Sequence, residues 1–274
     1  MARRTFMVYV TSGDISDARV RMACDLAARF DARLIGISAR TYPADTFAHG
    51  AISNETLNYE TQKIAAEFKD REANFRRLAC EKTARMEWRC AQEFPIQGVV
   101  REMRAADLLI IGTDREVARP QQPLDVVSAL LRTGRPVLLV PDRVRELPLA
   151  NVFVAWKDTR EARRVVLDAL PVLRSAVSVT LAGIGEDNRS QTEIRSQLAD
   201  VATYLSGHGV TTEQLIVEQP KKAAGEEIIG LAREKGADLI VAGAYGRSQV
   251  GEWIFGGVTE TLIHKSPIAC FLSH

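Results

Sequence analysis

An internal repeat restricts the fold of this chain more than any other feature of its sequence. The stretch "AADLLIIGTDR" covers residues 105–115, and the similar stretch "GADLIVAGAYGR" covers residues 236–247. An offset of 131 residues takes Asp107 to Asp238, and the same offset takes Gly112 to Gly243 without a gap. Upstream, "TFMVYVTSGDISDARVRMACDLA" pairs with "NVFVAWKDTREARRVVLDALPVL" at an offset of about 146. The repeat predicts two copies of one structural unit.

Each half alternates short apolar segments with amphipathic ones. In the first half we expect strands over 5–10, 33–38, 84–90, 107–112 and 136–140, and helices over 15–30, 54–82, 95–104 and 123–133. In the second half we expect strands over 151–156, 177–183, 213–218, 238–243 and 267–272, and helices over 159–173, 189–206, 223–235 and 256–265. Strands rich in Val, Ile and Leu between amphipathic helices are typical of parallel sheets with helices on both faces. The sequence therefore predicts an α/β fold with two doubly wound domains, residues 1–145 and 146–274, each built on a five-stranded parallel sheet.

Charge and hydropathy exclude two classes of partner. The chain has 36 basic and 35 acidic residues, and no stripe of Lys and Arg stands apart from compensating acids. We therefore expect no nucleic-acid partner. The longest apolar runs, such as "PVLLVP" and "DLLIIG", are far shorter than the roughly 20 residues that span a bilayer, so we expect no membrane partner either.

The cysteines and histidines show no metal-ligand spacing. They are Cys24, Cys80, Cys90, Cys270, His49, His208, His264 and His274. We interpret the cysteines as buried free thiols of a cytoplasmic protein, and we expect no metal.

The loop after the fourth strand of the second half contains the strongest ligand signal. In an open parallel sheet, ligands bind beyond the carboxyl ends of the strands where the strand order reverses, which selects the loops after the first and fourth strands. Gly243 is followed after two residues by Gly246, and after nine more by Gly256 and Gly257, with a helix continuing at Val258. Glycines let backbone N–H groups approach a phosphate, and a helix N-terminus offers free donors. Glycines that only turn the chain are the alternative.

This spacing, with the ending "SPIACFL", resembles the universal stress protein (UspA) family, whose ATP-binding members carry G-x2-G-x9-G-(S/T) at this place. The resemblance covers essentially the whole chain as a tandem pair. It implies Rossmann-like domains of the adenine nucleotide alpha-hydrolase type, whose fifth strands pair antiparallel in an internal pseudo-dimer. Related tandem proteins often form homodimers as well. The resemblance also implies binding of ATP or a related adenine nucleotide, with the base and ribose against Ala155, Trp156 and Lys157.

Two residues depart from the family pattern. Gly257 stands where ATP-binding relatives have a Ser or Thr hydroxyl for the phosphate, and the hydroxyl of Thr259 points elsewhere on the helix. Lys157 stands where relatives usually have an Asp, which exchanges a hydrogen-bond acceptor for a cation. Lys157 either contacts a phosphate or is solvated. We interpret Arg247 as a solvated loop cation rather than as a residue that binds the phosphate.

The first half lacks this loop. At the offset of 131 residues, the positions of Gly246, Gly256 and Gly257 are occupied by Arg115, Asp125 and Val126. An Asp at the start of a helix repels a phosphate but favours the helix itself. We therefore expect a degenerate, structural copy without a nucleotide site.

The leading hypothesis is a stress-response protein that binds an adenine nucleotide in its C-terminal domain as a sensor or regulator. The alternative is a ligand-free interaction module with a vestigial loop, in which Trp253 and Phe255 pack on the domain instead of covering a ligand. ATP hydrolysis is least favoured, because no recognisable Mg-binding acid lies near the loop. Glu226 and Glu227 are better explained by a helix start than by catalysis.

Overall fold

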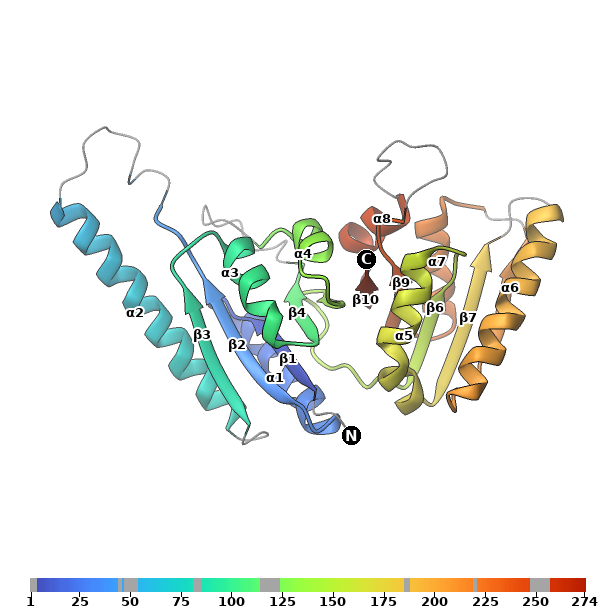
Figure 1. The fold of residues 1–274 in the computed structure, drawn as a ribbon, viewed down its shortest axis with the longest axis horizontal. Helices are drawn as coiled ribbons and strands as arrows, with labels where there is room; N and C mark the ends of the chain where they lie inside the picture. Colours follow the sequence, from blue (N-terminus) through green and yellow to red (C-terminus); the bar gives the residue numbers. More distant parts are fainter. Residues whose placement is uncertain are drawn as a thin grey trace. The chain divides into compact units, whose positions relative to one another are not determined.

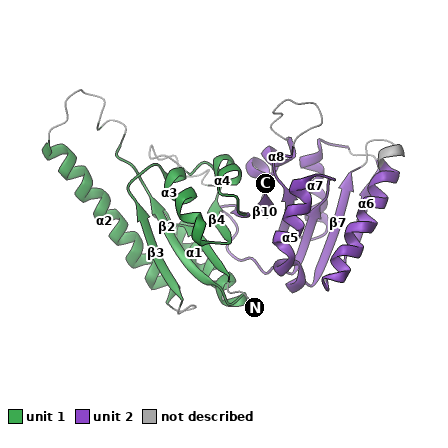
Figure 2. Ribbon diagram, in the orientation of Figure 1, with its two compact units in different colours: residues 1–135 green, residues 136–274 purple. Residues whose placement is uncertain are grey.

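The structure, a computed structural model, describes residues 4–43, 46, 54–80, 85–113, 124–184, 188–218, 221–246 and 257–274, without the side chains of 188–190. The chain divides into two compact units, residues 1–135 and 136–274 (Figure 2). Among the candidate residues, Gly256 lies outside the described residues, as do Arg115, Arg247, Trp253 and Phe255.

The first unit alternates strand and helix as expected. Its elements are β1 (Thr5–Tyr9), α1 (Asp14–Arg29), β2 (Arg33–Ala39), α2 (Asn54–Ala79), β3 (Met86–Ala91), α3 (Pro95–Glu102), a 3-10 turn (Met103–Ala105), β4 (Leu108–Gly112) and α4 (Val126–Arg132). The strands are parallel in the order β3-β2-β1-β4, and helix α1 contacts α2 while α3 contacts α4 (Figure 1). The long helix predicted from the helical spacing of Leu57, Ile64, Phe68 and Phe75 is confirmed; the last three side chains are buried, and Leu57 is half-buried.

The second unit contains the same succession of strands and α-helices between two additional strands, one before it and one after it. Its elements are β5 (Val137–Val140), β6 (Asn151–Ala155), α5 (Arg160–Ser175), β7 (Ser178–Ile184), α6 (Asn188–Gly207), β8 (Glu213–Val217), α7 (Ala224–Glu234), β9 (Leu239–Gly243), α8 (Gly257–Lys265) and β10 (Ala269–Ser273). The order is β5-β10-β9-β6-β7-β8, with all neighbours parallel except β5 and β10. The α/β fold with parallel sheets and flanking helices is confirmed.

The antiparallel pair that the resemblance implied is present, and it lies within the second unit. Cys270, Phe271 and Leu272 of β10 face Leu139, Leu138 and Val137 of β5. All four residues of β5 are buried. The units divide before β5. The stretch "PDRVRELPLA" at 141–150, which its two prolines and several charges predict to be the linker, follows β5. The domain limits 1–145 and 146–274 remain our prediction.

The two halves of the sequence repeat also correspond in how their first and fourth strands pair. Phe6 of β1 lies beside Leu108 of β4, and the residues at the two offsets, Val152 of β6 and Leu239 of β9, lie beside each other in the same way. Asp107 Oδ2 accepts the backbone N–H of Thr5 at 2.9 Å. In the second unit, Asp238 Oδ2 accepts the backbone N–H groups of residues 150 and 151 at 2.8 and 3.3 Å. The repeated Asp thus ties together the starts of two adjacent strands, which is a structural role.

The expectation that all the cysteines are buried is wrong for two of them. Cys24 and Cys270 are buried, and burial raises the pKa of Cys270 to about 12. Cys80 and Cys90 are exposed. Cys80 follows the end of α2, and Cys90 lies on β3, which has a neighbouring strand on one side only in the order of its unit. An edge position covers a side chain less than a central one does.

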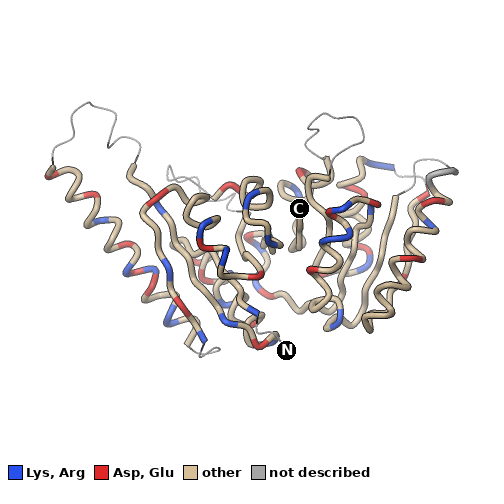
Figure 3. The backbone as a smooth tube through the Cα atoms, viewed as in Figure 1, with Lys and Arg blue, Asp and Glu red and all other residues tan. Residues whose placement is uncertain are grey.

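Positive and negative charges alternate over both units. Figure 3 shows Lys and Arg interleaved with Asp and Glu along helix α2. Among the described residues, no helix has the length and apolar character that crossing a membrane requires.

Candidate functional site

The candidate nucleotide site lies at the carboxyl ends of two neighbouring strands of the second unit. Ala155, the last residue of β6, lies beside Ala242 near the end of β9, so the loops that follow leave the sheet side by side. A Cβ built on Gly246 would lie 3.4 to 3.5 Å from the side chain of Thr159. The structure therefore brings residues 155–159 and 243–246 together at the carboxyl ends of β6 and β9.

Helix α8 is tied to this loop by two hydrogen bonds. The backbone N–H of Tyr245 donates to Thr259 Oγ1 at 3.1 Å, and the Tyr245 hydroxyl donates to Glu260 Oε1 at 2.9 Å. The hydroxyl of Thr259 is thus engaged by this loop N–H. The start of α8, with Gly257 and Val258, is thereby held beside the glycine loop. The first N–H groups of a helix have no partner within the helix and can bind an anion.

The backbone of Tyr245 adopts a left-handed conformation with φ 53°. Side-chain-bearing residues rarely adopt this region, so the surrounding contacts must hold Tyr245 in place. Besides the two bonds to α8, Ala244 N–H donates to the carbonyl of Ser273 at 2.8 Å. Sequence reasoning could not find this conformation, because Tyr is not a residue that favours it.

Gly243 and Gly246 meet different surroundings. A Cβ on Gly243 would lie 2.6 Å from the backbone nitrogen of Ala162 and 2.8 Å from the carbonyl carbon of Glu161. These are rigid backbone atoms in the first turn of α5, so Gly243 is required by packing. A Cβ on Gly246 would meet only side chains, the nearest being Glu161 Oε2 at 3.0 Å. A Cβ on Gly257 would meet nothing within 4 Å.

The first unit has a glycine at the position that corresponds to Gly243, and it too is closely surrounded. A Cβ on Gly112, the counterpart of Gly243, would lie 2.3 to 2.8 Å from the buried guanidinium of Arg19. The glycine that both halves share therefore has a packing role in both. Packing does not demand Gly246 or Gly257 to the same degree, and these glycines are absent from the first half.

A buried carboxylate lies beneath the glycine loop. Glu161 is 3% exposed, and its Oε1 accepts a charged hydrogen bond from Arg160. Burial raises the pKa of Glu161, but hydrogen bonds from Arg160, from its own backbone N–H and from Thr159 outweigh burial and hold that pKa below the usual value. The carboxylate is therefore ionised at neutral pH and places negative charge near Gly246. Sequence reasoning missed it, because its burial results from the contact between α5 and the loop after β9.

The loop after β6 contributes two unsatisfied donors. The indole Nε1 of Trp156 is buried and has no hydrogen-bond partner among the described residues. Lys157 is exposed; its carbonyl accepts the backbone N–H of Thr159 at 2.7 Å, and its ammonium forms neither a hydrogen bond nor an ion pair within the described part of the chain. The neighbouring Asp158 is instead paired with Arg163. An indole N–H and an ammonium can both donate to a ligand oxygen or nitrogen.

At the equivalent helix start in the first unit, a side chain of the protein accepts the backbone N–H groups. Asp125, the counterpart of Gly256, accepts the backbone N–H groups of Val127 and Ser128 at 3.2 Å each, and thereby caps α4. The expected helix-terminus role of Asp125 is confirmed. A carboxylate that occupies these donors leaves no place for a phosphate there.

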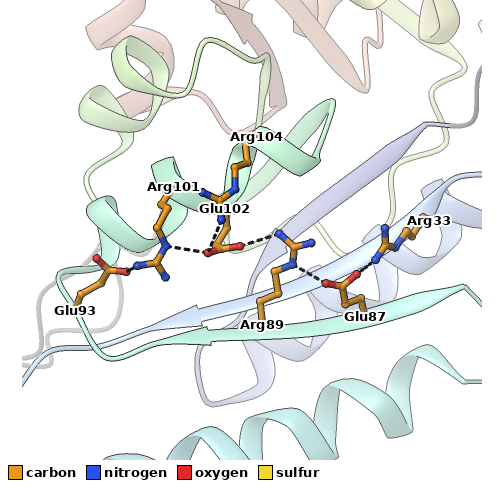
Figure 4. Close-up of polar contacts among 7 residues, drawn as sticks. All are labelled: Arg33, Glu87, Arg89, Glu93, Arg101, Glu102 and Arg104. Carbon is orange, nitrogen blue, oxygen red and sulfur yellow. Dashed lines mark hydrogen bonds and ion pairs between the residues drawn. The ribbon is translucent and has the colours of Figure 1, made fainter.

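Two other groups of charged residues have structural explanations. Glu226, in the first turn of α7, accepts a hydrogen bond from Lys265 Nζ at 2.7 Å, and this bond lowers the pKa of Glu226. A chain of ion pairs crosses β2, β3 and α3 in the first unit (Figure 4). Within the described residues, no three His, Cys, Asp or Glu side chains are arranged to hold a metal ion.

Comparison with known proteins finds the likeness of the second half of the chain. The sequence model of the universal stress protein family matches residues 150–274. The second half of the chain is therefore similar to universal stress proteins. A curated universal stress protein of Methanocaldococcus jannaschii is 29% identical over 79 residues, which are 29% of this chain and 47% of that protein. The match thus spans about half the length of that relative.

Solved universal stress proteins extend the likeness to the fold of the whole chain. A universal stress protein from Archaeoglobus fulgidus DSM 4304 has a TM-score of 0.74 at 13% identity, covering 98% of this chain and 97% of that one. A likeness at this identity shows the fold alone. Another A. fulgidus universal stress protein, solved in complex with dAMP, covers 46% of this chain and 98% of that one at 20% identity, with a TM-score of 0.38.

Proposed function

We propose that the universal stress protein domain binds an adenine nucleotide, ATP or a related compound, and acts as a sensor or regulator in a stress response. The observation that carries the proposal is the glycine loop after β9. Gly243 is explained by its contact with the α5 backbone, but Gly246 and Gly257 have more room around them. Glycines that packing does not demand are consistent with the close approach of a ligand.

The residues present fit such a ligand in two groups, one for the base and ribose and one for the phosphates. Ala155, Trp156 and Lys157 follow β6 and would face the base and ribose, with the vacant Trp156 Nε1 as a donor. The phosphates would lie at Gly246, Gly256, Gly257 and Val258, where the start of α8 offers backbone N–H groups. Lys157 supplies a cation from the opposite loop. The first half, residues 1–145 in our division, would serve as a degenerate copy.

One observation favours the alternative of a ligand-free interaction module. The ionised Glu161 lies beneath Gly246, and its charge opposes a phosphate at that place. In the module, the loop is vestigial and the chain acts through its surfaces. The homodimer implied by the resemblance and the cytoplasmic location inferred from the cysteines belong equally to both hypotheses.

Nucleotide binding is tested by mass spectrometry of the purified protein and by its melting temperature with ATP. At 100 times the dissociation constant, a ligand stabilises its domain by about 2.7 kcal/mol, which raises Tm by roughly 5 °C. We expect this rise in the wild type and its loss in Gly246→Val, whose side chain would occupy the space of the phosphate. Gly207→Val is the matched control, because a Cβ there meets nothing within 4 Å and Gly207 lies at the far end of α6.

Two results would contradict the proposal. Absence of both co-purified nucleotide and any ATP-dependent shift would leave the interaction module as the better hypothesis. An ATP effect that Gly246→Val leaves unchanged would place the ligand in a different loop.

A further inference from the structure

The first unit buries a pair of arginines where its strands β1 and β2 end. Arg40 directly follows β2, and its side chain is 7% exposed. Its Nη1 donates to Glu67 Oε2 of helix α2, whereas its Nη2 is buried and has no hydrogen-bond partner among the described residues. A buried donor of a charged group without a partner is costly, and native structures rarely retain one without a reason.

The second arginine of the pair, Arg71, lies one turn further along α2 and shares the same carboxylate. Its Nη2 lies 3.5 Å from Glu67 Oε2, and its Nη1 donates to Ser38 Oγ at 2.9 Å. Its Nε donates to Ser12 Oγ at 3.3 Å, in the loop after β1. Burial lowers the pKa of Arg71; the Glu67 carboxylate opposes this effect, and the charge of Arg40 adds to it. The two guanidinium groups lie against the same oxygen of Glu67, close enough to repel each other.

The charges within this cluster do not balance. Arg40 and Arg71 share one oxygen of Glu67, and the remaining partners, Ser12 and Ser38, are neutral. The cluster therefore carries a net positive charge in a mostly buried place. Such a charge is stabilised by an anion that accepts hydrogen bonds from it.

Another acid on the same face of α2, Glu60, forms no ion pair with Arg40 or Arg71 within the described residues. Helix α2 runs back along the segment that follows β2, because Arg71 contacts Ser38, Glu67 contacts Arg40, and Thr61 contacts Tyr42 at 2.9 Å. Glu60 precedes Glu67 by two turns and thus lies at the level of Tyr42. Its Oε2 is buried and also has no hydrogen-bond partner among the described residues.

We propose that Arg40 and Arg71 form a binding site for a small oxyanion, the carboxylate or phosphate group of a metabolite, in the first unit. Guanidinium groups present planar forks of N–H donors that match both oxyanions. The site lies at the carboxyl ends of parallel strands, where doubly wound sheets bind ligands. Glu67, whose side chain is 31% exposed, is the group that the arriving oxyanion displaces toward solvent. The site is separate from the nucleotide loop of the second unit.

The proposal is tested by the melting temperature of the full chain in inorganic phosphate, in acetate and in chloride at equal ionic strength. We expect phosphate or acetate to raise Tm above chloride in the wild type. In Glu67→Gln the affinity should increase about ten-fold, because removing a competing carboxylate corresponds to about 1.4 kcal/mol. In Arg71→Gln the effect should vanish. Arg76→Gln is the control, since Arg76 is an exposed arginine of the same helix that pairs with Glu72.

The two anions identify the chemistry of the ligand. A shift with phosphate alone indicates a phosphate-bearing ligand, and a shift with acetate alone indicates a carboxylate. If Arg71→Gln does not fold, Arg71→Lys keeps the charge without the planar fork and should weaken binding while Glu67→Gln strengthens it.

Two outcomes would overturn the site. One is the absence of any shift beyond chloride in both the wild type and Glu67→Gln, which would make the cluster purely structural. The other is a shift that survives in Arg71→Gln, which would place the anion elsewhere. A phosphate effect that persists in Gly246→Val and disappears in Arg71→Gln belongs to the arginine pair, whatever the outcome for the nucleotide.

Discussion

At the scale of single residues, the glycines of the second unit separate into two kinds. Gly243 has α5 backbone atoms within 3 Å of the place where a Cβ would stand, and its counterpart Gly112 has the guanidinium of Arg19 there. These glycines maintain the packing of a strand end against the first turn or two of a helix. Gly257 has open space, so the absence of a hydroxyl there is not enforced by the fold.

Gly257→Ser should therefore strengthen nucleotide binding. The new side chain meets nothing within 4 Å, and its hydroxyl would lie at the start of α8 where a phosphate is expected. A hydrogen bond to a charged group contributes about 1.5 kcal/mol, or roughly ten-fold in affinity for ATP measured by calorimetry. Gly257→Ala is the matched control, since it adds the Cβ without the hydroxyl. Equal affinities of the Ser and Ala variants would refute the phosphate contact.

At the scale of elements, β3 is joined to its neighbours by a chain of ion pairs. Arg89 Nε lies 2.6 Å from Glu87 Oε1, and Arg89 Nη1 lies 2.7 Å from Glu102 Oε2 at the end of α3 (Figure 4). Arg101 Nε adds a bond of 2.9 Å to the other oxygen of Glu102. Charged side chains on an edge strand discourage pairing with a strand of another chain. Glu102 is the member that several arginines share.

Glu102→Gln should destabilise the first unit at neutral pH and lose this effect in acid. Burial raises the pKa of Glu102, but the hydrogen bonds from Arg101 and Arg89 outweigh burial and lower that pKa. A carboxyl with a lowered folded-state pKa contributes stability above its unfolded pKa, about 4.3, and loses it as the pH falls through the folded value. We expect the variant to lose roughly 1 kcal/mol at pH 7, measured by urea unfolding.

The pH dependence distinguishes this effect from a simple loss of packing. The difference between wild type and Glu102→Gln should shrink as the pH falls below the unfolded pKa of about 4.3 and through the lowered pKa of the folded wild-type carboxyl. Glu55→Gln, at an exposed position in the first turn of α2, is the control and should change stability little. A deficit in Glu102→Gln that is constant with pH would show that the ion pairs contribute nothing.

At the scale of the whole molecule, the strand Val137–Val140 decides where the chain divides. We expected it as the fifth strand of the first domain, and the linker was expected after it. It pairs with β10 and belongs to the second compact unit. The pairing covers the edge that β10 would otherwise expose.

A chain of residues 136–274 should therefore be more stable than one of residues 146–274. The shorter chain lacks the four buried residues of β5 and the backbone bonds to β10. Loss of four buried apolar side chains corresponds to several kcal/mol, on the order of 1.5 kcal/mol or more each. Thermal unfolding and light scattering of the two chains measure the difference. Equal stability without self-association of the shorter chain would show that β5 is dispensable.

The succession of elements could be predicted from the sequence almost to the residue. Apolar runs, amphipathic spacing and the two offsets are local or regular patterns, and the observed strands and helices begin and end within about two residues of the predicted ones in nearly every case. The spacing of Gly243, Gly246, Gly256 and Gly257 likewise indicated the family before any geometry was known. These features are determined by the sequence alone because each depends on neighbours along the chain.

Only the tertiary structure decided which residues carry which role. That Gly243 is held by packing, that Glu161 is buried under the loop, and that β5 joins the second unit all depend on contacts between distant segments. The pairing of Arg40 with Arg71 across β2 and α2 could not be read from either segment alone. Burial and charge balance are properties of the assembled surroundings, and the periodicity that determines strands and helices contains no information about them.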